Sequence, residues 1–184
     1  MTLADMNPHD ELKSLLELFP SGPLLIERAE HVSSGGTPEP YRTLLAHREH
    51  MTERMEAFHK TSVDVRVLEK RLDGNIYSRK IVLLKHGSSQ VVQFGIVRFD
   101  LSSVSDKVRE EILSEQTPLG RILIRHNVFR EIELGAILRI TAGPGLGAAL
   151  EMRSGDVTYG RLATIFCDDH PAVDLLEISA PLPS

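Results

Sequence analysis

The sequence has no tryptophan and only one cysteine, Cys167, among its 184 residues. A single thiol cannot form a disulfide within the chain or a thiolate cluster around a metal ion. Cys167 lies between Phe166 and Asp168 at the end of an apolar run, which favours a small packing residue over a nucleophile. Abundant leucine, isoleucine and valine make up for the missing tryptophan, and the length predicts a single domain over residues 1–184.

No stretch approaches the roughly 18 apolar residues of a membrane span, and the start, MTLADMNPHDELK, has no basic leader followed by an apolar core. We therefore expect a cytoplasmic protein without a membrane span. The formal net charge is −5 and the basic residues are scattered through the chain. This charge predicts no nucleic-acid binding, which needs a cationic surface against the phosphates. Small molecules or proteins are the expected partners, and the oligomeric state is left open.

The N-terminal third of the sequence predicts short helices joined by loops. Residues 1–8 look like a loose end, and DELKSLLELF, residues 10–19, spaces its apolar side chains helically. Residues 33–40, SSGGTPEP, have the glycine, proline and polar content of a loop within the domain. Residues 41–59 again follow a helical period, with a break where Thr52 can cap a second helix.

Further along the chain, apolar and polar residues alternate in short runs separated by turn residues, which predicts strands. The expected strands lie near 63–71, 76–86, 90–101, 129–142, 159–167 and 172–180, and two further helices lie near 105–116 and 119–126. The short links between strands argue against a doubly wound parallel sheet. The predicted fold class is α+β, a single antiparallel sheet of about six strands with helices packed on one face.

Three motifs suggest other chemistries but lack the context that each requires. AGPGLGAA, residues 142–149, matches a dinucleotide-binding turn, yet Gly155 follows too soon for a crossover helix, so we interpret this segment as a flexible loop. His47 and His50 could share a helical face, but His59 does not complete a zinc site, and we expect no metal. A Gly-x-Ser-x-Gly turn for a serine nucleophile is absent from the sequence.

Charged side chains inside apolar runs are the strongest local signal. Arg79 precedes the run IVLL, and Arg161 and Glu177 lie in the two apolar runs of YGRLATIFCDDHPAVDLLEISAP, a predicted hairpin. Burying such a charge is costly unless an opposite charge pairs with it. Each residue taken alone is interpreted as part of a salt bridge across the sheet, for Arg79 with Glu69 or Glu133, or else as the lining of a site.

Four segments carry a family resemblance: LLAHREHMTERMEAFHKTSVDVRVLEKR (44–71), YSRKIVLLKHG (77–87), TPLGRIL (117–123) and YGRLATIFCDDHPAVDLLEISAP (159–181). In this order they resemble segments of bacterial chorismate pyruvate-lyase, the 4-hydroxybenzoate-forming lyase, and of the wider chorismate-lyase-like group. They cover most of the chain after residue 44. The resemblance implies the antiparallel fold of that group, with an internal ligand cavity.

The resemblance also implies roles for particular residues. Arg79 and Glu177 match the family's substrate-contacting arginine and catalytic carboxylate. The residues expected to bind the substrate are Met51, Thr52, Leu119, Gly120, Arg161 and Arg98. Glu177 is offset by one residue from the family position, which requires a bulge or a different turn. The family's Gly-Arg in the preceding hairpin is Gly95-Ile96 here, with Arg98 two places later.

The reaction that the resemblance implies is elimination of pyruvate from chorismate, or a close relative, to give a hydroxybenzoate without any cofactor. Arginine and the backbone N–H groups of the Pro-Leu-Gly turn suit the carboxylates of such a ligand, and Glu177, held as a neutral acid by an apolar cavity, is the expected proton donor. One alternative is a non-catalytic domain that binds a small aromatic acid, related to the effector-sensing domains of transcription regulators. Another is an enzyme acting on a different aromatic or enol-ether acid. The expected partner is a small aromatic or cyclohexadiene carboxylate.

The turn of the last hairpin decides whether Arg161 and Glu177 meet. An even-numbered turn pairs Glu177 with Leu162 and places Arg161 on the other face of the sheet. An odd-numbered turn or a bulge pairs Glu177 with Ala163 and brings Arg161 onto the same face. In both cases we expect Glu177 to point into the cavity, because Arg79 would otherwise be a buried charge without a counterpart.

Overall fold

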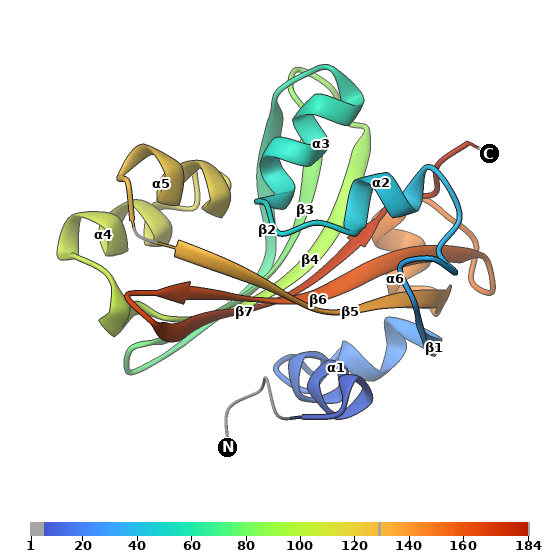
Figure 1. The fold of residues 1–184 in the computed structure, drawn as a ribbon, viewed down its shortest axis with the longest axis horizontal. Coiled ribbons are helices and arrows are strands. Elements are labelled where there is room, and N and C mark those ends of the chain that lie inside the picture. Colours follow the sequence, from blue (N-terminus) through green and yellow to red (C-terminus); the bar gives the residue numbers. More distant parts are fainter. Residues whose placement is uncertain (1–5, 129, 184) are drawn as a thin grey trace.

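The computed structural model describes residues 6–128 and 130–183, which form one seven-stranded antiparallel sheet with helices on both faces (Figure 1). The spatial order of the strands is β1-β5-β6-β7-β4-β3-β2. Their bounds are β1 Ile26–Val32, β2 Val63–Asp73, β3 Ile76–Lys85, β4 Val91–Asp100, β5 Arg130–Ala142, β6 Val157–Cys167 and β7 His170–Ser179. The predicted α+β fold class with a single antiparallel sheet is confirmed.

All six predicted strands are present, and β2, β3 and β4 form the expected antiparallel meander. The predicted start of β5 at residue 129 lies outside the described residues. The seventh strand, β1, was not predicted, because the charged side chains in IERAEHV interrupt the alternation of apolar residues. It lies at one edge of the sheet, where it pairs only with β5.

Six α-helices and two short 3-10 helices accompany the sheet in the described part of the chain. They are α1 Pro8–Leu16, α2 Tyr41–Leu45, α3 Met51–His59, α4 Asp106–Ser114, α5 Leu119–Arg125 and α6 Pro144–Leu150, with η2 at Gly22–Leu24 and η3 at Leu101–Ser103. None of them is long and apolar enough to cross a bilayer. The prediction of a loose end over residues 1–8 is wrong at its last positions: Asn7 caps α1 by accepting a hydrogen bond from the His9 N–H at 2.9 Å. Residues 1–5 lie outside the described part.

Helix α6 replaces the flexible loop that the glycines of residues 142–149 predicted. A Cβ atom on Gly143 would lie 2.5 Å from the Leu24 carbonyl oxygen, and one on Gly145 would lie 3.1 Å from the same atom. The glycines therefore let this segment approach the backbone of η2 closely. Helical structure survives here because Leu146 and Leu150 are buried in the core.

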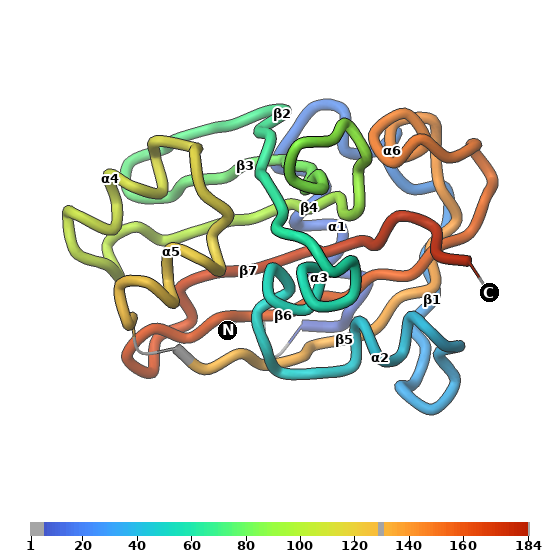
Figure 2. Tube along the Cα trace, turned by 90° about the horizontal axis from the view of Figure 1, so that it is seen from above, coloured from blue at the N-terminus to red at the C-terminus, as the bar shows by residue number. Residues whose placement is uncertain are grey.

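The helices cover both faces of the sheet, where the sequence predicted one. Helices α2 to α5 lie over the same face (Figure 2), whereas α1 lies below the opposite face (Figure 1). Leu12 and Leu15 of α1 pack in one apolar cluster with Leu146 of α6 and with Phe94 and Ile178 of the sheet. Both faces of the central strands are therefore buried, which explains their nearly continuous burial.

The hairpin of β6 and β7 brings Arg161 and Glu177 directly opposite each other. Asp168 and Asp169 form its turn with φ angles of 49° and 63°, as in a two-residue type I′ turn. Phe166 pairs with Pro171 but Ile165 pairs with Val173, so Ala172 is an extra residue in β7. This bulge puts both charges on one face. The predicted alternative of a bulge that brings Arg161 onto the face of Glu177 is confirmed, but the predicted partners Leu162 and Ala163 are wrong, because Glu177 pairs with Arg161 itself.

Candidate functional site

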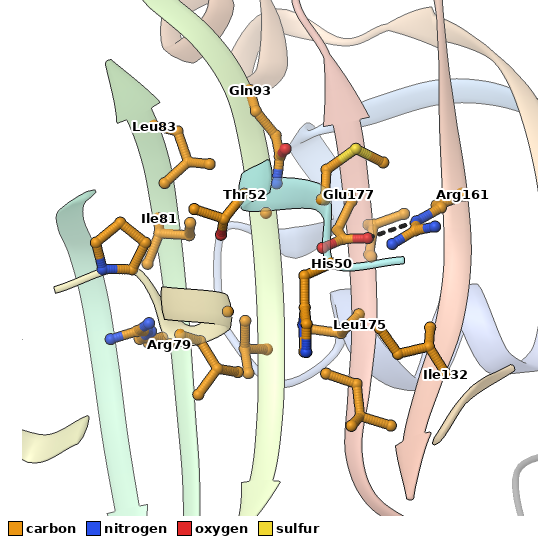
Figure 3. Close-up of a pocket in the computed structure, with 18 residues that line it drawn as sticks. His50, Thr52, Arg79, Ile81, Leu83, Gln93, Ile132, Arg161, Leu175 and Glu177 are labelled. Atoms are coloured by element: carbon orange, nitrogen blue, oxygen red, sulfur yellow. Dashed lines mark hydrogen bonds and ion pairs between the residues drawn. The ribbon is translucent and has the colours of Figure 1, made fainter. Parts of the chain in front are cut away.

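A cavity lies between the sheet and the first turns of α3 and α5 (Figure 3). Its floor consists of residues from β3, β4, β5, β6 and β7, and its roof includes Met51 and Thr52 of α3 with Leu119 and Gly120 of α5. Its volume is about 40 Å³, room for roughly three water molecules. A ligand of more than a few atoms exceeds this volume.

The floor is built around one row of residues that face each other across four strands. Ile81 pairs with Gly95, Gly95 with Glu177, and Glu177 with Arg161. Gly95 leaves the middle of this row without a side chain. A Cβ atom there would lie 3.3 Å from Cγ1 of Ile81, so even alanine would begin to fill the hollow.

Arg161 and Glu177 form a buried ion pair at one side of the cavity (Figure 3). The Arg161 Nε–H donates to Glu177 Oε2 at 2.7 Å, and the Arg161 side chain has no exposed surface. Its Nη1 and Nη2 groups donate to the carbonyl oxygens of His47 and Glu49, each at 3.0 Å. Arg161 therefore ties the segment between α2 and α3 to the sheet, and Glu177 balances its charge.

His47 adds no charge to this side of the cavity near neutral pH. Burial and the adjacent Arg161 guanidinium lower the pKa of His47 to about 4. Its Nε2 lies 2.6 Å from the Leu44 carbonyl oxygen and its Nδ1 lies 3.3 Å from Arg161 Nη1. A neutral imidazole that donates from Nε2 and accepts at Nδ1 satisfies both contacts.

Arg79 lies across the cavity from this pair (Figure 3). It is 2% exposed, its Nη1 has no hydrogen-bond partner, and no ion pair in the described part of the chain includes it. Burial lowers its pKa, while the Tyr77 hydroxyl and the Glu115 carboxylate act in the opposite direction. Arginine stays protonated at neutral pH nonetheless. The cavity therefore contains one buried cation that no side chain neutralises.

The two carboxylates predicted to pair with Arg79 lie elsewhere. Glu69 forms a short ion pair with Lys80 on the other face of β3. Glu133 is exposed and lines a separate hollow beside Glu11 of α1. The salt bridge expected across the sheet for Arg79 is therefore absent, whereas the salt-bridge interpretation holds for Arg161 and Glu177.

Seven of the eight residues singled out from the sequence line this one cavity: Arg79, Glu177, Met51, Thr52, Leu119, Gly120 and Arg161. Arg98 does not. The alternation of β4 places Gly95 and Val97 in the cavity lining and turns Arg98 to the opposite face, where it lies 3.5 Å from the carboxylate of Asp174.

Sequence reasoning missed two polar residues of the lining, His50 and Gln93. Gln93 is 3% exposed, and its side-chain oxygen Oε1 has no hydrogen-bond partner. Its position two residues before Gly95 places it on the cavity face of β4, a signal that strand alternation provides. His50 was considered only as a metal ligand, although it directly precedes Met51.

The roof depends on close contact between α3 and α5. A Cβ atom on Gly120 would lie 2.9 Å from Oγ1 of Thr52 and 3.2 Å from Cβ of His50. Only glycine permits this approach without displacing the start of α3.

In the residues that the structure describes, no three histidine, cysteine or acidic side chains are grouped so that they could hold a metal ion.

No known protein family matches this sequence, and no curated protein matches it. The fold is similar to the effector domain of PhnF from Mycobacterium smegmatis, with a TM-score of 0.51 and 11% identity over 72% of this chain and 88% of that chain. It is also similar to the ligand-binding domain of a putative GntR-family transcriptional regulator from Bordetella bronchiseptica, with a TM-score of 0.47 and 13% identity over 64% and 85%. The chain thus has the chorismate-lyase-like fold found in regulator domains.

The similarity to the effector domain of PhnF contradicts the expectation of an enzyme that eliminates pyruvate from chorismate to give a hydroxybenzoate. That structure is an effector domain and is not described as an enzyme. In the site, Glu177, the expected proton donor, accepts a hydrogen bond from the Arg161 Nε–H in an ion pair.

Proposed function

We propose that this chain is a non-catalytic ligand-binding domain that holds a small organic monoanion, a carboxylate, against Arg79. The observation that carries the proposal is the buried guanidinium of Arg79, whose Nη1 has no partner. An uncompensated buried charge costs several kcal/mol. A carboxylate that enters the cavity removes this penalty and forms charge-assisted hydrogen bonds with the guanidinium.

The charges of the lining favour a ligand with one negative charge. Arg161 and Glu177 neutralise each other, and the lowered pKa of His47 leaves its ring neutral. Arg79 is then the single uncompensated charge among these four residues. A dianion would introduce a second negative charge without a buried partner, so a monocarboxylate fits better.

A binding role also agrees with the fold, because the domain of PhnF with a similar fold is an effector domain. We infer that residues 1–184 act as one such domain. The aromatic or cyclohexadiene character of the ligand and a cytoplasmic location remain predictions.

The test is to replace Arg79 by glutamine and to measure thermal unfolding with acetate, butyrate, benzoate or 4-hydroxybenzoate, against chloride at equal ionic strength. A carboxylate at 100 times its Kd stabilises the wild type by about 2.7 kcal/mol, or roughly 5–10 °C for a chain of this length. Arg79→Gln should lose this shift. Without ligand, the variant should unfold at the same or a higher temperature than the wild type, because it buries no uncompensated charge.

Arg66→Gln is the matched control, because Arg66 is an exposed arginine on β2. It should respond to carboxylates as the wild type does. Equal stabilisation of Arg79→Gln and the wild type by the same carboxylate would refute the proposal. Release of pyruvate from chorismate by the wild type would show that the domain is catalytic.

A further inference from the structure

We propose that Gln93 selects, among small carboxylates, those that have a hydrogen-bond donor remote from the carboxylate group. The inference rests on the proposed function, because it assumes a carboxylate at Arg79. Gln93 is 3% exposed and its Oε1 has no partner. Arg79 presents an unsatisfied donor to the same cavity. A hydroxy or amino acid carries the groups that complement both.

Arg79 and Gln93 lie at opposite ends of the cavity floor. Arg79 pairs with Val97 of β4, whereas Gln93 pairs with Leu83 of β3. Positions 79 and 83 are four residues apart on one strand, which separates their Cα atoms by about 13 Å at the usual rise of ~3.4 Å per residue. Both side chains face the cavity from adjacent strands (Figure 3). A ligand that reaches both is therefore elongated.

The floor between these two residues is bare and apolar, which suits the body of such a ligand. Gly95, between Gln93 and Val97 on β4, contributes no side chain, and Ile81 is its neighbour on β3. These positions provide van der Waals contact and no competing polar group. The polar contacts to the ligand are then concentrated at its two ends.

The hydroxyl group of Ser179, next to Gln93 in the sheet, has another partner. Ser179 is the residue opposite Gln93 on β7, and its hydroxyl donates to the Ala180 carbonyl oxygen at 2.8 Å. Leu83, opposite Gln93 on β3, has no donor in its side chain. A donor group on the ligand can therefore bind Gln93 Oε1 without competition from Ser179 or Leu83.

The expected selectivity follows from the penalty of an unpaired buried acceptor. A ligand with a donor satisfies Gln93 Oε1, whereas an analogue without one closes the cavity over an unsatisfied oxygen. The penalty corresponds to a ratio of dissociation constants of roughly 5- to 100-fold. Replacing Gln93 by methionine, which has a similar length and no amide, should abolish the ratio.

The experiment measures Kd by calorimetry for matched acids, butyrate against 4-hydroxybutyrate and benzoate against 3- and 4-hydroxybenzoate. In the wild type, at least one hydroxy acid should bind at least about 5-fold more tightly than its parent acid. In Gln93→Met, and in Gln93→Leu as a second variant of different shape, the ratio should fall to about 1 while the parent acid still binds. Gln90→Met is the matched control, because Gln90 is exposed outside this cavity.

The outcomes separate this inference from the proposed function. Wild-type protein that binds no acid of either series would overturn both. Binding that requires Arg79 but shows no preference for a hydroxy acid would overturn only the role of Gln93. A preference that persists unchanged in Gln93→Met would do the same, because another group would then accept the ligand's hydrogen bond.

Discussion

Replacing Glu177 by glutamine tests whether the ion pair with Arg161 is structural. Glutamine keeps an oxygen that can accept the 2.7 Å hydrogen bond from the Arg161 Nε–H, but it removes the negative charge. Breaking a buried ion pair by removing one partner costs about 3–5 kcal/mol. The carbonyl oxygens of His47 and Glu49 still accept from Arg161 at 3.0 Å each, which reduces the loss. We therefore expect a decrease of about 2–3 kcal/mol in the free energy of unfolding.

For a chain of 184 residues this decrease lowers the midpoint of thermal unfolding by roughly 4–12 °C, at about 2–4 °C per kcal/mol. Calorimetry and urea unfolding at pH 7 measure it. Glu17→Gln is the control, because the Lys13–Glu17 pair spans 3.8 Å on the surface and should contribute less than about 0.5 kcal/mol.

A double-mutant cycle isolates the interaction itself. Arg161→Gln combined with Glu177→Gln removes both charges, so the double variant should be more stable than the sum of the two single effects predicts, by at least about 1 kcal/mol. A Glu177→Gln protein that unfolds like the wild type would show that the pair does not stabilise the fold. Additive effects in the cycle would lead to the same conclusion.

Two further substitutions test the far face of the sheet and the roof of the cavity. Burial, and next the charge of Asp174, raise the pKa of Glu11 to about 7, so the folded state loses stability relative to the unfolded state as pH rises from 4.5 through 7. Glu11→Gln should remove this pH dependence and stabilise the protein at pH 8 by about 2 kcal/mol after allowance for solvent screening. Urea unfolding at several pH values measures this, and the same pH dependence of the free energy of unfolding in the variant and the wild type would contradict the prediction. Gly120→Ala places a Cβ atom 2.9 Å from Oγ1 of Thr52, so it should destabilise the fold by about 1–3 kcal/mol and weaken carboxylate binding. Gly35→Ala is the control, because nothing lies within 4 Å of its added Cβ atom, and it should change neither property. Equal melting temperatures for the two variants would refute this packing argument.

The fold could be predicted well from the sequence where side-chain alternation reflects burial. The segments around Val65 and Ile81 alternate or continue in apolar residues, and their strands were placed within a few residues of the observed bounds. The edge strand β1 has mainly charged or partly exposed side chains, so its pairing with β5 leaves no apolar signature. Helix α6 was missed for a related reason, since its glycines allow close backbone contact with Leu24 and contact of this kind is not visible in a linear pattern.

The site could be predicted in part from the sequence, because a charged side chain is conspicuous in an apolar strand. Arg79, Arg161 and Glu177 stood out for this reason, and all three line the cavity. What the sequence could not provide was which charges neutralise each other. That depends on the extra residue Ala172 and on the carbonyl oxygens of the α2–α3 segment, whose positions only tertiary structure defines. The result is one neutralised pair, Arg161 with Glu177, and one cation, Arg79, that has no ion-pair partner in the described part of the chain.

The strand order described above has a consequence for the protein's synthesis on the ribosome. The meander β2–β3–β4 and the pair β5–β6 can each form early, but the two halves of the sheet are joined by β7, which follows the other six described strands in the chain. Until His170–Ser179 leaves the exit tunnel, β4 and β6 present unpaired edges that invite aggregation. The nascent chain therefore completes its sheet late. A ribosome stalled before residue 170 would hold an intermediate with two unpaired strand edges, the kind of surface that chaperones protect from aggregation.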